Sequence, residues 1–375
     1  MSPINVLCAA TSYPADTSDW RGVFIRHLVD ALARRPDIQL SLWAPPGPLP
    51  DNVRYLPNHN EERMLSELMA AGGIAHLMRS RSLSGLTAPL KLLRSLHSTF
   101  RRESQTDLYH LNWLQTALPL PADGKPVLVT VLGTDLKLLA LPFVKSLMRR
   151  SLAARTAAIC PNAEWMVPEL RDAFGDTALI EPVTFGIDPI WVAVRRRPTA
   201  QKPKWLAVTR LTRDKLGPLF EWSAPLFNGQ ARELHLLGPM QEQVSIPEWV
   251  HYHGAASPQT LANEWFPQAH GLITLSQHAE GRPQVMLEAM ASGLPIIASD
   301  MPAHASLVQS GVTGSLCQSQ ESFAVALSAL EDPPTNQHRG EAARARVKRD
   351  IGTWDDCAQR YAAIYSRLAG DRIGK

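Results

Sequence analysis

Short apolar runs alternate along this chain with segments whose apolar residues recur every three to four positions. Runs of the first kind are typical of buried parallel strands. They lie at residues 4–10, 38–43, 53–56, 107–113, 127–133, 157–161, 205–211, 233–238, 250–254, 271–275 and 295–299. Helical spacing is found at residues 24–35, 61–102, 136–155, 258–268, 283–293, 320–330, 338–349 and 354–368. This alternation predicts an α/β protein with parallel sheets.

The alternation is interrupted once, at residues 189–203, where prolines and three consecutive arginines replace the apolar periodicity. A chain of 375 residues is long enough for two domains. We therefore expect one domain over residues 1–190, a linker, and a second domain over residues 200–353. The helix at 354–368 is expected to pack back on the first domain.

Composition narrows the class of protein. The formal net charge of +3 is small for this length, and no nucleic-acid-reading motif is present, so a nucleic-acid partner is not expected. The four cysteines have no paired spacing and are predicted to be buried thiols in a reducing compartment. A basic signal-peptide start and an apolar run of about 20 residues are both missing, which predicts a cytoplasmic location.

Two basic helical segments, at residues 63–102 and 136–155, leave two interpretations open. Basic amphipathic helices can lie on anionic membrane surfaces, which would place the protein at the periphery of the cytoplasmic membrane face. The alternative is a helix that packs on the core and exposes its basic face to water.

The strongest candidate chemistry lies in residues 276–314. A strand leads into a polar turn with Glu280 and Gly281, Pro283 stands at the expected first turn of a helix, and Glu288 follows on that helix. The first helical N–H groups, near Gln284 and Val285, suit a phosphate. Carboxylates accept hydrogen bonds from sugar hydroxyls, so the stretch suits a nucleotide sugar. Taken in isolation, the same stretch can also be interpreted as a surface turn with two solvated glutamates.

The wider pattern favours the nucleotide sugar. The order E-G-x-P, E-A-M-A-x-G-x-P and A-S-D, from Glu280 to Asp300, resembles the donor-binding segment of retaining, family 4 type glycosyltransferases of group 1. The resemblance implies the GT-B architecture, with two Rossmann-like domains facing across a central cleft. It also implies that Glu280 contacts the donor sugar and Glu288 the ribose. One departure is Ser306, at or near the position of a glutamate usual in that family.

Earlier segments match less completely. Residues 209–217 resemble the family's G-R-L-x-x-x-K-G loop, which implies that Arg210 and Lys215 hold the donor diphosphate. Three glycines at strand ends or in the first loop are further donor-side candidates: Gly238, Gly254 and Gly22. Residues 181–188 resemble the strand and turn that close the family's first domain.

The acceptor side departs most from the pattern. Leu132 stands where related enzymes often have a histidine before G-(S/T)-D. His110 on the neighbouring strand, or Asp135, is the candidate to replace that contact, although a lone histidine at a strand end is more often structural.

The resemblance implies sugar transfer, with retention, from a nucleotide-diphosphate sugar to a hydroxyl of a glycan or lipid-linked acceptor, in cell-surface polysaccharide or glycolipid synthesis. No Asp-x-Asp sequence or metal-ligand cluster occurs, so we expect neither metal nor other cofactor. Two alternatives stay open: a nucleotide-sugar epimerase or hydrolase of the same architecture, and a non-catalytic sugar-nucleotide-binding protein.

Overall fold

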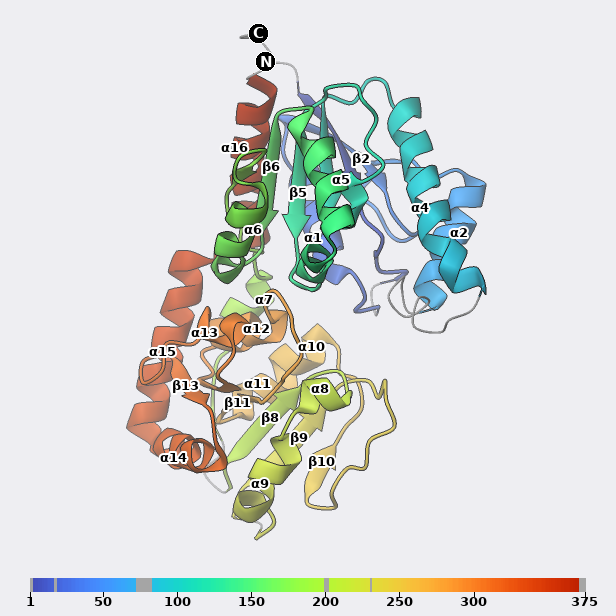
Figure 1. Cartoon of the computed structure of the whole chain (residues 1–375). Helices are drawn as coiled ribbons and strands as arrows, with labels where there is room; N and C mark the ends of the chain where they lie inside the picture. The colour runs from blue at the N-terminus through green and yellow to red at the C-terminus, as the bar shows by residue number, and fades with distance from the viewer. Residues whose placement is uncertain (1–2, 17–18, 72–82, 199–201, 230, 371–375) are drawn as a thin grey trace. The chain divides into compact units, whose positions relative to one another are not determined.

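The computed structural model describes residues 3–16, 19–71, 83–198, 202–229 and 231–370 (Figure 1). They form two compact units, one lying within Met1–Phe185 and Trp354–Lys375 and the other within Gly186–Thr353. Each unit is built around one parallel sheet, so the predicted α/β class is confirmed. None of the described helices is both long and apolar enough to cross a membrane.

The first unit contains a seven-stranded parallel sheet in the order β3-β2-β1-β4-β5-β6-β7. Its central strands are almost entirely buried apolar residues, because helices cover both faces of the sheet. The strands are β1 Ile4–Ala9, β2 Ile38–Trp43, β3 Arg54–Tyr55, β4 Leu108–Asn112, β5 Val127–Val131, β6 Ala157–Pro161 and β7 Leu179–Ile180.

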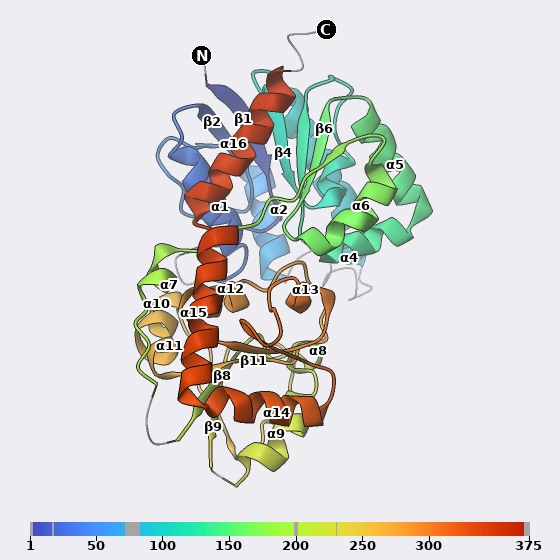
Figure 2. The same ribbon diagram turned by 90° about the vertical axis from the view of Figure 1, so that its left-hand side faces the viewer.

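One face of this sheet is covered by α1 (Val23–Ala33) and by the C-terminal helix α16 (Trp354–Gly370), which run beside each other in Figure 2. Tyr361 and Tyr365 of α16 are fully buried against the sheet. The other face is covered by α2 (His59–Ala70), α4 (Leu83–Arg102), α5 (Pro142–Ala153) and α6 (Val167–Phe174). Short 3₁₀ turns, η1 (Leu114–Ala117), η2 (Thr134–Ala140) and η3 (Glu164–Met166), follow β4, β5 and β6.

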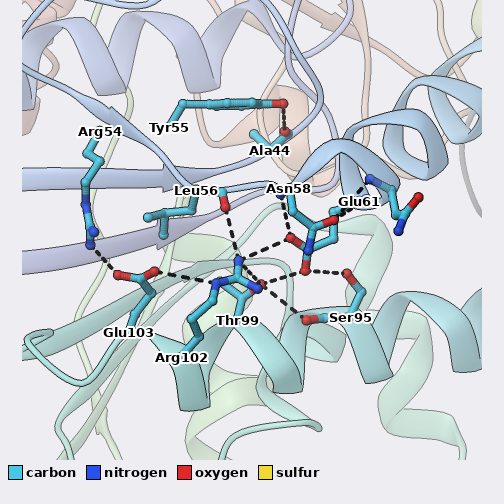
Figure 3. A network of polar contacts seen from close by, with 11 residues as sticks. Ala44, Arg54, Tyr55, Leu56, Asn58, Glu61, Ser95, Thr99, Arg102 and Glu103 are labelled. Carbon is cyan, nitrogen blue, oxygen red and sulfur yellow. Dashed lines mark hydrogen bonds and ion pairs between the residues drawn. The ribbon is translucent and has the colours of Figure 1, made fainter.

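A buried carboxylate, Glu61, ties α2 to α4 (Figure 3). Its side chain accepts the backbone N–H of Asn58 at 2.8 Å, completing a capping box at the start of α2. The same carboxylate accepts the hydroxyls of Ser95 and Thr99, each at 2.9 Å, and Arg102 at 3.2 Å. Burial alone raises the pKa of Glu61, but these four donors outweigh it and hold the pKa below its usual value.

The second unit contains a six-stranded parallel sheet in the order β10-β9-β8-β11-β12-β13. Its strands are β8 Lys204–Val208, β9 Glu233–Leu237, β10 Val250–Tyr252, β11 Gly271–Thr274, β12 Ile296–Ser299 and β13 Gly314–Cys317. Its helices are α7 Pro189–Ala193, α8 Arg213–Leu216, α9 Leu219–Phe227, α10 Pro258–Thr260, η4 Leu261–Trp265 (a π-helical turn), α11 Phe266–Gln268, α12 Gln284–Ala291, α13 Pro302–Ala305, α14 Gln320–Glu331 and α15 Pro333–Asp350.

Several local predictions need correction. Residues 189–203 were expected to be a linker, yet 189–193 form α7, whose buried Trp191 packs on Phe266 of the second unit. The strand expected in residues 181–188 begins earlier than predicted: β7 is Leu179–Ile180, and beyond it the N–H groups of Glu181 and Val183 still donate to Ile159 O (3.1 Å) and Pro161 O (3.0 Å) of β6. The segment with helical spacing at residues 61–102 contains α2 and α4, and residues 72–82 lie outside the described part. Strand β13 and helix α9 were not anticipated.

Candidate functional site

The loop after β8 and the loop after β11 meet because those two strands are neighbours in the sheet. The backbone N–H of Gln277 donates to Asp214 O at 2.8 Å. Gly217 has φ +52°, and a Cβ there would lie 2.0 Å from Leu275 O. Only glycine allows this approach without strain, so the end of α8 is pressed against the segment that leads to Glu280.

This contact brings together three of the residues predicted from separate motifs. Lys215 Nζ lies 2.5 Å from Glu280 Oε2, and the two side chains are 12% and 18% exposed. Burial lowers the pKa of Lys215, and the negative charge of Glu280 opposes this shift. Burial also lowers the pKa of Arg210, again opposed by Glu280. Two partly desolvated cations and one carboxylate therefore share one site at the carboxyl ends of β8 and β11.

His278 also belongs to this site and was not predicted. Burial lowers the pKa of His278, the positive charge of Lys215 lowers it further, and Glu280 opposes both. The imidazole is thus kept neutral beside the two cations. A histidine two residues before Glu280 was visible in the sequence, but the family motif assigns that position no role.

Helix α12 begins next to this cluster. Pro283 is the N-cap of the helix, one position before the predicted first turn, and its carbonyl accepts the N–H of Met286 at 3.2 Å. Gln284 and Val285 occupy the first turn, where backbone N–H groups have no intrahelical acceptor. The side chain of Gln284 donates to Gly186 O at 3.0 Å. Gly281, in the turn before the helix, is buried.

Glu288 lies on α12 in a different environment from Glu280. Burial raises the pKa of Glu288 to about 8, and the negative charge of Asp188 adds to the increase. Asp188 is the N-cap of α7 and accepts the N–H of Ile190 at 2.9 Å. The Glu288 carboxyl is therefore largely protonated at neutral pH, and can both donate and accept a hydrogen bond.

The three glycine candidates all have positive φ. Gly238 (φ +142°) packs so closely on β8 that a Cβ would lie 1.7 Å from Thr209 O, and its N–H donates to Gly254 O at 2.7 Å. Gly254 itself has φ +73°. In the first unit, Gly22 (φ +70°) is the N-cap of α1, and a Cβ there would collide with Ser12. The positive φ favours glycine at each position, and at Gly238 and Gly22 the close neighbours also exclude a Cβ.

The acceptor-side roles predicted for His110 and Asp135 do not fit their surroundings. His110 is 0% exposed, and its ring nitrogens bond the hydroxyls of Tyr365 (2.5 Å) and Thr130 (2.8 Å). Burial lowers the pKa of His110 to about 3. Asp135 is also buried and accepts the backbone N–H groups of Leu114 (3.0 Å), Leu132 (3.1 Å) and Gly133 (2.9 Å). Both side chains are buried and hydrogen-bonded within the first unit, so they have a structural role there.

Across the part of the chain that the structure describes, no group of three or more His, Cys, Asp or Glu side chains has an arrangement that could hold a metal ion.

Comparison with known sequences points to the second unit. The family described as glycosyl transferases group 1 matches residues 203–332, which include Arg210, Lys215, Glu280 and Glu288. D-inositol 3-phosphate glycosyltransferase of Streptomyces griseus is 29% identical over 137 residues, covering 36% of this chain and 28% of that protein. N-acetyl-alpha-D-glucosaminyl L-malate synthase of Bacillus anthracis is 31% identical over 107 residues, covering 28% of each protein. The chain thus aligns with only about a quarter of these relatives' length.

Comparison with solved structures covers nearly the whole chain. Sucrose-phosphate synthase from Thermosynechococcus elongatus superposes with a TM-score of 0.73 over 98% of this chain and 100% of that one, at 18% identity. HepE of Anabaena, solved in complex with UDP and glucose, superposes with a TM-score of 0.66 over 97% of this chain and 100% of that one, at 15% identity. The chain therefore has the GT-B fold of two Rossmann-like domains, and its second unit carries the match to glycosyl transferases group 1.

Proposed function

We propose that this protein is a glycosyltransferase that moves a sugar, with retention of the anomeric configuration, from a nucleotide-diphosphate sugar to a hydroxyl group. The observation that carries the proposal is the contact between Lys215 and Glu280, with Arg210 beside it, at the start of α12. Two cations suit a diphosphate, and a carboxylate suits sugar hydroxyls. The motif resemblance and the group 1 match support the same class.

In the proposed reaction the protein acts through position and charge. Arg210, Lys215 and the first N–H groups of α12 stabilise the negative charge that develops on the leaving diphosphate. The acceptor oxygen bonds to the anomeric carbon as the bond from that carbon to the diphosphate oxygen breaks. The acceptor's proton passes to the released phosphate, so no protein base is required. Glu280 and Glu288 hold the sugar and the ribose in place.

The donor is proposed to carry a uridine or other nucleoside diphosphate, because the Anabaena HepE structures were solved with UDP and with UDP-glucose. The acceptor is proposed to be a glycan or a lipid-linked hydroxyl, in polysaccharide or glycolipid synthesis. No metal is required in this proposal, and turnover is expected to continue in EDTA.

Helix α5 supports a peripheral membrane contact on the cytoplasmic side. Phe143 is 75% exposed, and Leu141 and Leu147 are 51% and 43% exposed. Lys145 and Arg150 lie on the same helix. Exposed apolar side chains next to cations suit an anionic lipid surface. Flotation with vesicles of anionic or zwitterionic lipid tests this contact. The wild-type protein is expected to bind only the anionic vesicles, and Phe143→Ser is expected to bind them more weakly.

The proposed activity is tested with a panel of UDP- and GDP-sugars. Thermal-shift measurements identify the donor, because a ligand that binds the folded state raises the apparent stability. Incubation of that donor with simple glycans and lipid acceptors, followed by NMR of the anomeric proton, reports transfer and retention. Epimerisation of the sugar without acceptor would instead favour the epimerase. Binding without any turnover would favour a sugar-nucleotide-binding protein, in line with Leu132 and Ser306 as departures.

A further inference from the structure

Strands β11 and β12 are joined at their carboxyl ends by a side chain. Ser299, the last residue of β12, donates its hydroxyl proton to Ser276 O at 2.6 Å. Ser276 is 2% exposed, and its own hydroxyl accepts the backbone N–H of His278 at 3.1 Å. The backbone that leads from β11 to Glu280 is therefore held at Ser276 from two directions.

Behind Ser299 lies a histidine to which the family motif assigns no role. His304, in α13, is 0% exposed, and its Nδ1 lies 2.9 Å from Ser299 O and 3.1 Å from Ser299 Oγ. A carbonyl oxygen can only accept, so Nδ1 carries the proton. The Ser299 hydroxyl has already given its proton to Ser276, so its oxygen also accepts from Nδ1. The hydrogen bonds thus run in one direction, from His304 through Ser299 to Ser276.

This direction determines the tautomer of His304. With the proton on Nδ1, the neutral ring has a lone pair on Nε2, and Nε2 has no hydrogen-bond partner among the described residues. Burial lowers the pKa of His304, the bond to Ser299 and the charge of Glu280 oppose that shift, and Lys215 supports it. His304 is therefore within electrostatic reach of the Lys215–Glu280 pair while remaining uncharged.

A charged His304 would disturb that pair. An imidazolium would be a third cation beside Lys215 and Arg210 and would compete with Lys215 for Glu280. A shorter apolar side chain at position 304 would remove the N–H that donates to Ser299. The backbone around Ser276 would then be less restrained. Either change would let Glu280 move relative to Lys215, although no residue of the pair is itself altered.

We propose that His304 is a positioning residue for the donor site: through Ser299 and Ser276 it holds the segment that carries Glu280 in the geometry that pairs it with Lys215. The proposal rests on the proposed function for its kinetic consequence, but its structural part is independent of any ligand. His304 does not touch the reacting atoms in this proposal; it acts through Ser299.

Two substitutions at position 304 separate the effect of the hydrogen bond to Ser299 from the effect of side-chain volume. His304→Asn keeps an N–H donor that can reach Ser299, whereas His304→Leu removes it. With the donor sugar found in the thermal-shift panel, His304→Leu is expected to lower kcat roughly tenfold to a hundredfold with a smaller change in KM. His304→Asn is expected to recover most of the loss. Ser299→Ala should have a similar effect, and the double variant should be no worse than His304→Leu alone.

His338→Leu is the matched control, since His338 is an exposed histidine on α15 of the same unit. It should leave turnover unchanged. Thermal unfolding of every variant separates misfolding from mispositioning. If His304→Leu is folded and turns over like the wild type, or if His304→Asn is no better than His304→Leu, the proposal is wrong.

A ligand-free measurement keeps the proposal testable if no nucleotide sugar binds. In ¹⁵N-histidine NMR at neutral pH, His304 is expected in the neutral tautomer with the proton on Nδ1. The backbone amide of Glu280 is expected to shift in His304→Leu and not in His338→Leu. A proton on Nε2, or an unchanged Glu280 amide, would overturn the proposal whatever the protein's substrate.

Discussion

The raised pKa of Glu288 makes the stability of the second unit depend on pH. Its folded-state pKa is about 8 against a usual 4.5. The folded protein therefore holds a proton that the unfolded chain releases. For a carboxyl with a raised pKa, stability is fully present below about pH 4.5 and declines as the pH rises towards 8.

The magnitude follows from linkage. Each pH unit between the two pKa values lowers the free energy of unfolding by about 1.4 kcal/mol, so the upper limit over the whole interval is roughly 5 kcal/mol. Glu288 keeps part of its surface in contact with solvent, which reduces the penalty. We therefore expect about 2–3 kcal/mol to be lost between about pH 5 and about pH 8.

Substitution by glutamine tests this directly. Glu288→Gln keeps the shape of the side chain and is neutral at every pH, so the variant should lack this part of the pH dependence. Its unfolding temperature should exceed that of the wild type by roughly 4–12 °C more at pH 8 than at pH 5, since 1 kcal/mol corresponds to about 2–4 °C in a unit of this size. Thermal melts at several pH values, followed by tryptophan fluorescence, measure the difference.

The control is Glu221→Gln, which removes an exposed carboxylate from α9 of the same unit. Its difference from the wild type should be small and nearly independent of pH. If Glu288→Gln and the wild type differ by the same amount at every pH, the carboxyl is not protonated in the folded protein, and the reasoning from burial is wrong.

Three further predictions concern the donor site and the first unit. Glu280→Gln and Lys215→Met should each lower turnover by roughly a hundredfold or more. In urea unfolding, the double variant should lose less stability than the sum of the two single losses, because each single change leaves the other charge unpaired. Unchanged turnover in both single variants would contradict the assignment of the site. Gly217→Ala should lower the free energy of unfolding by about 1–3 kcal/mol and weaken nucleotide binding, since a Cβ there collides with a backbone carbonyl. Gly229→Ala, with open space around it, should lower that free energy much less. Equal urea midpoints for the two variants would contradict this prediction. Glu61→Gln should lower the free energy of unfolding by about 1–3 kcal/mol at neutral pH. Because the pKa of Glu61 is lowered, the difference in stability from the wild type should narrow as the pH falls below about 4.5. A difference in urea midpoints that stays constant with pH would count against this prediction.

Local patterns were sufficient for most of the elements. Buried parallel strands are nearly continuous apolar runs, so the run at residues 157–161 predicted β6 (Ala157–Pro161) to the residue. Helix α12 was placed correctly because Pro283 and Gly293 mark its two ends. Helix α7 was missed because it is only one turn long, which is too short for helical periodicity to show.

The residues of the candidate site could be named from motifs, but not their interactions. Lys215 and Glu280 are 65 positions apart, and three strands, β9, β10 and β11, lie between them along the chain. They meet because the sheet places β8 directly beside β11. Strand order is set by packing across the whole unit, which a single sequence pattern does not contain.

The environment of a titratable side chain was likewise decided by the tertiary structure. His110 and His304 both look polar in the sequence, yet both are fully buried. Both ring nitrogens of His110, and Nδ1 of His304, are hydrogen-bonded to neighbouring residues. Glu288 and Glu280 belong to one motif, yet burial raises the pKa of Glu288 while Glu280 pairs with a lysine. The sequence by itself determined which chemical groups the donor site contains. Their charges and contacts depend on desolvation and on partners distant in the chain, which only the folded unit supplies.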